Sequence, residues 1–291
     1  MLHWIGILLL SGNTTTGWRL GTHMLRSASE LGYTPSTLSL VRVFRSVPPH
    51  MFDRAANTVM YREANARFQE IVKAGTDPDA LTLQGIIHAK SVEKGSRLKA
   101  LAAFSQATTA WQTRQRENGS VTKEIAAVVP GKGTQASAAT SDCVTNSDAV
   151  DAAADRRFTL PPPRQPRWEW EVSCILGQAN ILVQSRETTE EALKLFKVAA
   201  LELDNPVGFL MLAKLMDGPR DSPERRVYLL KAAVSGDTEA CQELGELEAL
   251  AAARNDLSQK QRTEHKMLSK EWLRLADGED LSAFIKANVG D

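Results

Sequence analysis

A spacing pattern recurs along the chain and limits its fold more than any other feature. A small residue is followed four positions later by a large apolar residue, and three positions after that by a small residue. The clearest copies are Ala100, Phe104, Ala107 and Ala192, Phe196, Ala199. Weaker copies are Gly21, Leu25, Ala28; Ala64, Phe68, Ile71; Arg225, Leu229, Ala232; and Leu268, Trp272, Leu275. Spacings of four and three place all three residues on one helix face, so the pattern predicts a series of helices with one buried face each.

Glycines precede three of these copies by fifteen residues. They are Gly6, Gly85 and Gly177, which lie upstream of Gly21, Ala100 and Ala192. A glycine inside a helix costs about 1 kcal/mol relative to alanine. Close approach of a paired helix would explain why it is retained, and a small residue on that helix suits the approach. We therefore expect each glycine to lie where two antiparallel helices meet.

Helix starts fall at regular places between the copies. A side-chain acceptor followed by proline is typical of an N-cap and first turn. This dipeptide occurs at Thr34-Pro35, Asp77-Pro78, Asn205-Pro206 and Ser222-Pro223, and Thr238-Glu239 stands at the equivalent place. Pro48-Pro49 should end a preceding helix near Ser46, because proline cannot continue a helix.

The composition changes sharply over residues 113–167. Ala, Ser, Thr, Asp and Gly dominate there, and the stretch closes on Pro161-Pro162-Pro163. Such a segment buries too little apolar surface to offset the entropy of ordering, so we expect a flexible insertion. The predicted organisation is N-terminal helical repeats over 1–112, this low-complexity insertion over 113–167, and C-terminal helical repeats over 168–291.

The intervals between most copies are 33 to 43 residues, the length of one helix–turn–helix unit. The exception is an interval of 92 residues that contains the insertion. We therefore expect an all-α fold, an α-solenoid in which each antiparallel helix pair buries its apolar face on its neighbours.

The C-terminal part resembles the Sel1-like branch of the tetratricopeptide superfamily. The matching residues are Leu176-Gly177, Ala192, Phe196, Ala199-Ala200, Ala232 to Gly236, Glu239-Ala240, Leu244-Gly245, Glu271-Trp272 and Leu275-Ala276. The resemblance is best over 168–278 and weaker toward the N-terminus. It implies scaffolding between proteins, as an adaptor or assembly factor, and it supplies no catalytic residues.

A second resemblance leaves an alternative open. Leu31 to Ser36 and Lys73 to Ala80 look like the turns of pentatricopeptide repeats, which read single-stranded RNA. Thirty-five Lys and Arg residues balance thirty-five Asp and Glu residues, however, and phosphate binding normally requires a basic face. An organellar RNA-binding protein is therefore the alternative to a protein-binding one.

The composition also bears on the cellular environment. The longest apolar run, within Met1 to Gly12, is far shorter than the roughly 20 residues of a membrane span. It lacks a preceding cation, so we interpret it as a repeat helix and not as a secretory signal. Cys143, Cys174 and Cys241 are too scattered for a disulfide framework, and we expect reduced thiols. The expected compartment is intracellular, either cytoplasmic or mitochondrial.

No arrangement of residues predicts catalysis. The five histidines are at least 20 residues apart and have no Cys or His at ligand spacing, so we expect no metal and no cofactor. No G-x-S-x-G nucleophile motif occurs. We therefore expect a non-enzymatic protein.

Trp168 and Trp170 are the candidate partner-binding residues. They open the second block of helices, directly after the insertion, and residues two apart on a helix point to different faces. Two interpretations follow. Either Trp170 lies in the core while Trp168 covers the helix end, or an exposed indole forms a binding hot spot. We expect a protein or peptide partner, bound on the helical surface.

Overall fold

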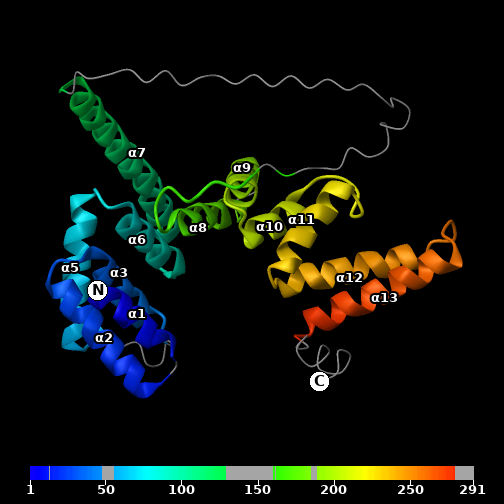
Figure 1. Ribbon diagram of the computed structural model, residues 1–291, viewed down its shortest axis with the longest axis horizontal. Helices are drawn as coiled ribbons and strands as arrows, with labels where there is room; N and C mark the ends of the chain where they lie inside the picture. Colours follow the sequence, from blue (N-terminus) through cyan, green and yellow to red (C-terminus); the bar gives the residue numbers. More distant parts are fainter. Residues whose placement is uncertain (13, 48–55, 129–159, 161, 185–188, 279–291) are drawn as a thin grey trace. The chain divides into compact units, whose positions relative to one another are not determined.

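The fold is described from a computed structural model, for residues 1–12, 14–47, 56–128, 160, 162–184 and 189–278. Every regular element in these ranges is helical, and consecutive helices pack in adjacent pairs (Figure 1). The predicted all-α class is confirmed for this part of the chain. The pairing of the helices is consistent with an α-solenoid. It does not identify the type of repeat.

The first compact unit comprises Met1–Val121 and Pro166–Thr189. Its helices are α1 (Leu2–Ser11), α2 (Thr15–Glu30), α3 (Thr34–Arg45), α5 (Val59–Ala74), α6 (Pro78–Lys90), α7 (Ser96–Val128, which extends beyond the unit) and α8 (Glu171–Val183). Contacts run from α1 through α2, α3, α5 and α6 to α8. In this packing α8 belongs with the N-terminal helices, although it follows the compositional boundary drawn at residue 168.

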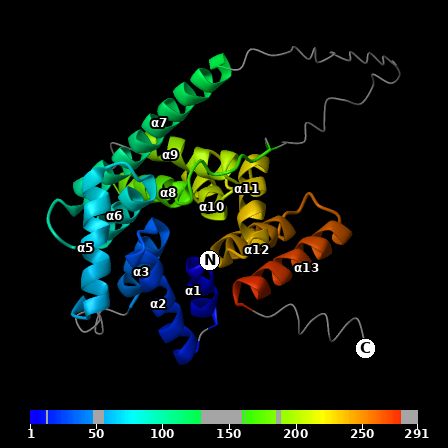
Figure 2. The ribbon, with the colours of Figure 1, turned by 60° about the vertical axis from the view of Figure 1, so that its left-hand side comes forward.

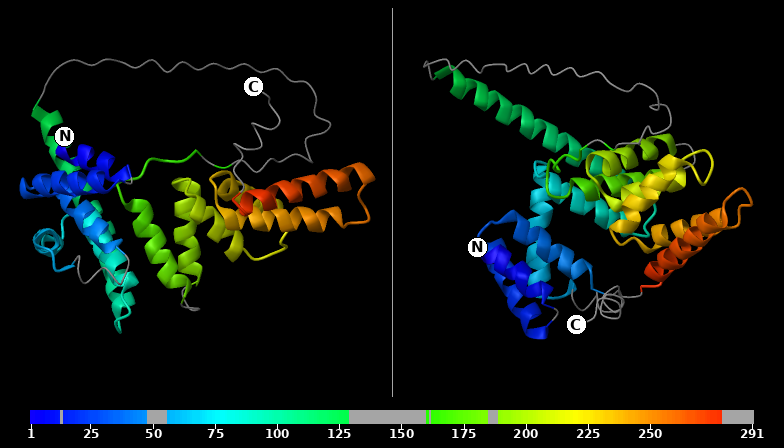
Figure 3. Two further views of the ribbon diagram at one scale, coloured as in Figure 1. Left: turned by 90° about the horizontal axis from the view of Figure 1, so that it is seen from below. Right: turned by 45° about the vertical axis from the view of Figure 1, so that its right-hand side comes forward.

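The second compact unit comprises Thr122–Gln165 and Glu190–Asp291. Its helices are α9 (Thr189–Lys197), the π-helix η2 (Val198–Glu202), α10 (Pro206–Leu215), α11 (Pro223–Val234), α12 (Thr238–Ala252) and α13 (Gln259–Ala276). Within this unit α12 and α13 form an antiparallel hairpin that is clear from both directions in Figure 3.

Most of the predicted helix starts are confirmed. The Asp77 carboxylate accepts from the Ala80 amide at 2.9 Å and caps α6. Asn205 and Ser222 cap α10 and α11 in the same way. The start of α3 has no side-chain cap, and α12 is capped by Asp237, one residue before the predicted position. Helix α3 ends at Arg45, with Ser46 as its C-cap, as predicted.

The prediction that each glycine meets a small residue of a paired helix is confirmed for Gly6 and Gly21. For Gly85 and Gly177 the predicted small partner is wrong. A Cβ built on Gly6 would lie 3.0 Å from the carbonyl oxygen of Gly21, so α1 and α2, neighbours in Figure 2, touch through their glycines. Gly85 and Gly177 instead face the same ring, that of Phe104 on α7. The large residue of the repeat frame therefore occupies the space that these two glycines leave.

The repeat frame marks buried residues in every copy but the last. Phe68, Phe104 and Phe196 are fully buried. In the last copy Leu268 is 46% exposed, whereas Trp272 and Leu275 are partly buried. The buried Ser269 of α13 donates to the Gly245 carbonyl of α12, so this helix packs through a face that adjoins the frame.

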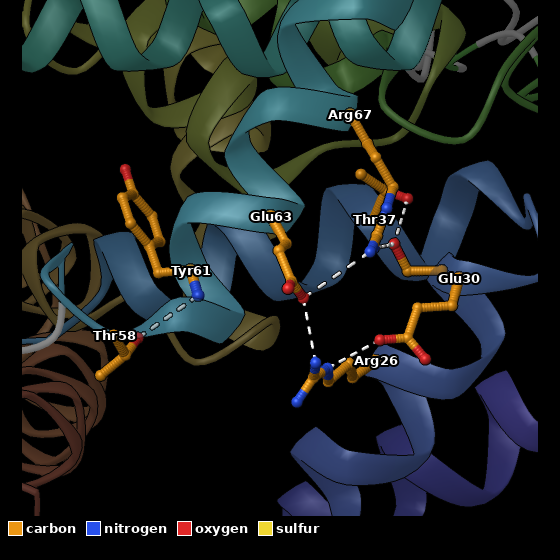
Figure 4. A network of polar contacts seen from close by, with 8 residues as sticks. Arg26, Glu30, Thr37, Thr58, Tyr61, Glu63 and Arg67 are labelled. Atoms are coloured by element: carbon orange, nitrogen blue, oxygen red, sulfur yellow. Dashed lines mark hydrogen bonds and ion pairs between the residues drawn. The ribbon is translucent and has the colours of Figure 1, made fainter.

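A polar network joins the first helices of the N-terminal unit (Figure 4). The Arg26 guanidinium on α2 donates to the Glu63 carboxylate on α5 at 3.0 Å. Arg67, one turn further along α5, donates to the buried hydroxyl of Ser29 at 2.8 Å, and that hydroxyl also bonds Thr37 on α3 at 2.7 Å. These hydrogen bonds link α2, α3 and α5. They also give hydrogen-bond partners to the buried Ser29 and Thr37 hydroxyls, which a purely apolar core could not provide.

Helix α7 continues to Val128, so the first residues of the predicted 113–167 insertion are helical. Residues 129–159 and 161 lie outside the described ranges. Among the described residues no helix combines the length and apolarity that crossing a membrane requires.

Candidate functional site

The two predicted tryptophans lie in the turn directly before α8, where this helix packs on the N-terminal unit. Trp168 is only 7% exposed, and its ring centroid is 5.7 Å from that of Trp111 on α7. Its indole nitrogen is buried and has no hydrogen-bond partner among the described residues. Trp170 is partly buried, and the Arg42 guanidinium of α3 lies over its ring at 5.5 Å. Their role in partner binding stays a prediction.

The backbone of Trp170 ties α8 to α6. Its amide donates to the Asp79 carboxylate at 2.8 Å, across 91 residues of sequence. Burial raises the pKa of Asp79 to about 6, and the neighbouring carboxylates of Asp77 and Glu169 add to the rise, whereas the Trp170 amide and Arg114 oppose it. Asp79 is thus an anchor for the start of α8 whose charge depends on pH near neutrality.

A groove runs beside α7 on the same unit, and sequence reasoning missed it. Its volume is about 500 Å³. The residues that line it are Val72, Lys73, Gly75 and Thr76 at the end of α5, and Ser105, Gln106, Thr109, Ala110, Thr113, Arg114 and Glu117 on α7. The only sequence signal is the run of small polar residues at 105, 109 and 113, which repeats every four residues and so forms one helix face.

The groove combines an apolar floor with polar and cationic walls. Val72 and Ala110 are its apolar residues. The Thr109 and Thr113 hydroxyls donate to carbonyls one turn earlier in α7, each at 3.1 Å, so their oxygens remain as acceptors. Lys73 and Arg114 are exposed cations that form no ion pair within the described part of the chain. The groove can therefore offer charge and hydrogen bonds to a ligand.

The formal charge is distributed unevenly over the neutral chain. The N-terminal unit has 16 Lys and Arg residues against 11 Asp and Glu residues, and the other unit has 19 against 24. The unit with the groove is thus positive by five charges, and the other is negative by five. A field of this sign favours encounters between the N-terminal unit and acidic molecules.

Helix α1 adds an exposed apolar face to the N-terminal unit. Trp4 and Leu8 are 68% and 73% exposed, one turn apart on the side away from Gly6. The helix has no charged residue. Exposed apolar residues at this spacing are typical of surfaces that contact another helix.

Reactive groups are few in the described residues. Burial raises the pKa of Cys174 to about 11 and also raises that of Cys241, so both thiols stay protonated at neutral pH. No group of three or more His, Cys, Asp or Glu residues in the described ranges could hold a metal ion. A buried carboxylate, Glu248, is satisfied by Arg226 and by His265 at 2.5 Å.

Comparison with known proteins identifies no relative. No family model matches the chain, and neither a curated protein nor a solved structure matches it.

Proposed function

We propose that this protein is a non-enzymatic scaffold or adaptor that binds another protein on its helical-repeat surface. The observation that carries the proposal is the groove between the end of α5 and α7, with its apolar floor and its unpaired cations. The protonated thiols agree with a binding role, because a thiol with a raised pKa is a poor nucleophile.

A photo-crosslinking experiment in cells tests this function. A photoreactive amino acid is placed at Thr109, inside the groove, and in a control at Gln115, which is exposed on α7 but does not line the groove. We expect protein adducts from position 109, resistant to nuclease, and none or different ones from position 115. Adducts that are identical from both positions, or that disappear on nuclease treatment, would contradict the proposal.

RNA binding is the second candidate, and one observation favours it. Lys94, Arg97 and Lys99 are exposed around the turn between α6 and α7, beside a net excess of positive charge in their unit. Such a cluster could contact phosphates. Binding of a labelled 20-nucleotide oligouridine should then weaken steeply with salt and be reduced in the Lys94→Glu/Arg97→Glu variant. No binding at low salt would exclude this candidate.

A further inference from the structure

We infer that the groove beside α7 binds an acidic peptide segment of a partner protein, with Lys73 and Arg114 pairing to its carboxylates. This inference rests on the proposed function and adds the charge of the bound segment. Its basis is the geometry of the groove, the unpaired cations within it, and the charge of the unit around it.

The groove follows one face of α7. The residues of α7 that line it run from Ser105 to Glu117, a span of about 18 Å at 1.5 Å per residue. That length suits a short peptide segment that lies along the helix.

For a segment bound in extended form, the same span gives its length. An extended chain advances about 3.3 Å per residue, so about five residues lie along the groove. Successive side chains of a strand alternate in direction, so two or three of them face the floor formed by Val72 and Ala110. Ser105 and the Gln106 amide offer donors and acceptors to the peptide backbone, which an extended chain presents along its edges.

The charges of the lining select acidic side chains. Lys73 lies at the end of α5 and Arg114 on α7, and neither forms an ion pair within the described residues, although the charge of Arg114 also acts on Asp79. Glu117 is the one acidic residue of the lining, so the groove keeps an excess of positive charge. The net charge of the unit has the same sign and would steer an acidic segment toward the site. A basic segment would meet two unpaired cations and one anion, an unfavourable combination.

The experiment selects peptides on the full-length protein without presupposing their charge. A phage library of random seven-residue peptides is panned against the wild type. The strongest binder is synthesised with a fluorescent label, and its affinity is measured by fluorescence anisotropy. We expect enrichment of peptides with two or more Asp or Glu residues and a dissociation constant that rises with salt.

Two charge-reversal variants make the test specific. Lys73→Glu/Arg114→Glu changes the groove, and Lys94→Glu/Arg97→Glu removes the same charge from the turn between α6 and α7 of the same unit. We expect the groove variant to lose between about fivefold and thirtyfold in affinity, the range that two partly exposed ion pairs supply. The control variant should lose less than threefold. Far-ultraviolet circular dichroism checks that both variants keep their helices.

The outcomes separate this inference from the proposed function. If the selected peptides contain no acidic residues but lose binding to the groove variant, the inference is wrong and the protein-binding function still stands. An equal loss in both variants would overturn the inference too, because it would show attraction by net charge alone. If no peptide is selected and oligouridine binds instead, both proposals are wrong.

Discussion

Replacing Gly177 by alanine should destabilise the N-terminal unit, although alanine is the better helix former. The added Cβ would lie 2.6 Å from Cζ of Phe104, whereas carbon atoms pack best at about 3.5–4.0 Å. The ring has little room to move away, because Gly85 of α6 also packs against it: a Cβ built on Gly85 would lie 2.5–2.9 Å from Cε1, Cδ1 and Cζ of the same ring. Phe104 is also fully buried, so no solvent-filled space is available to it.

The magnitude follows from two opposing effects. Overpacking of a tight core costs about 1–3 kcal/mol, and the helix propensity of alanine returns up to about 1 kcal/mol. The net loss in free energy of unfolding should be about 1–2 kcal/mol. At a urea dependence of about 2 kcal/mol per molar, the unfolding midpoint should fall by roughly 0.5–1 M.

Tryptophan fluorescence during urea unfolding is the suitable assay, because five of the six tryptophans belong to the N-terminal unit. Gly12→Ala is the control: its Cβ would meet only the Leu9 carbonyl at 3.6 Å, so we expect a change within 0.5 kcal/mol. Phe104→Leu should relieve the clash, so Gly177→Ala should cost at least about 1 kcal/mol less in that background. Additive effects of the two substitutions would refute the contact between glycine and ring.

Three further predictions concern single groups. Because burial raises the pKa of Asp79 from its ordinary value of 3.8 to about 6, its contribution to stability is complete below about pH 4 and is lost as the pH rises through 6. Relative to Asp79→Asn, the wild type should lose about 1–2 kcal/mol between pH 4 and 7 in urea titrations, since this carboxylate is partly exposed and solvent reduces the effect. Arg226→Ala should cost about 2–4 kcal/mol in the C-terminal unit, because the buried Glu248 carboxylate would keep its charge with only His265 beside it. Trp272 fluorescence in a variant without other tryptophans reports the change, and a loss below 0.5 kcal/mol would contradict the burial of Glu248. Gly75→Ala should cost about 1 kcal/mol, since its φ of 69° is unfavourable for alanine, and an unchanged thermal midpoint would argue against this conformation.

The sequence predicts the features that depend on local periodicity. Phe104 and Phe196 repeat with small residues at helical spacing, and both are buried as expected. Acceptor–proline pairs such as Asp77-Pro78 mark helix starts because capping involves neighbours in the chain. For α13, periodicity was insufficient: the frame residue Leu268 is 46% exposed, and only the contact of Ser269 with Gly245 shows which face packs.

The candidate site depends on contacts that no local pattern contains. Asp79 and Trp170 are 91 residues apart, and nothing near either residue announces the other. The groove is lined by polar residues such as Gln106 and Thr113, which look like an ordinary solvated helix face until α5 is placed beside them. The composition averaged over 113–167 likewise does not show that residues 113–128 continue helix α7.

Because α8 completes the packing around Phe104, the order of synthesis affects how the N-terminal unit is assembled. When Val121 has been made, one side of this ring still lacks Gly177. The remaining 68 residues to Thr189 take about 3–14 s at a translation rate of roughly 5–20 residues per second. During those seconds an apolar surface on the nascent helices is open to chaperones, and the growing chain closes it itself when α8 arrives.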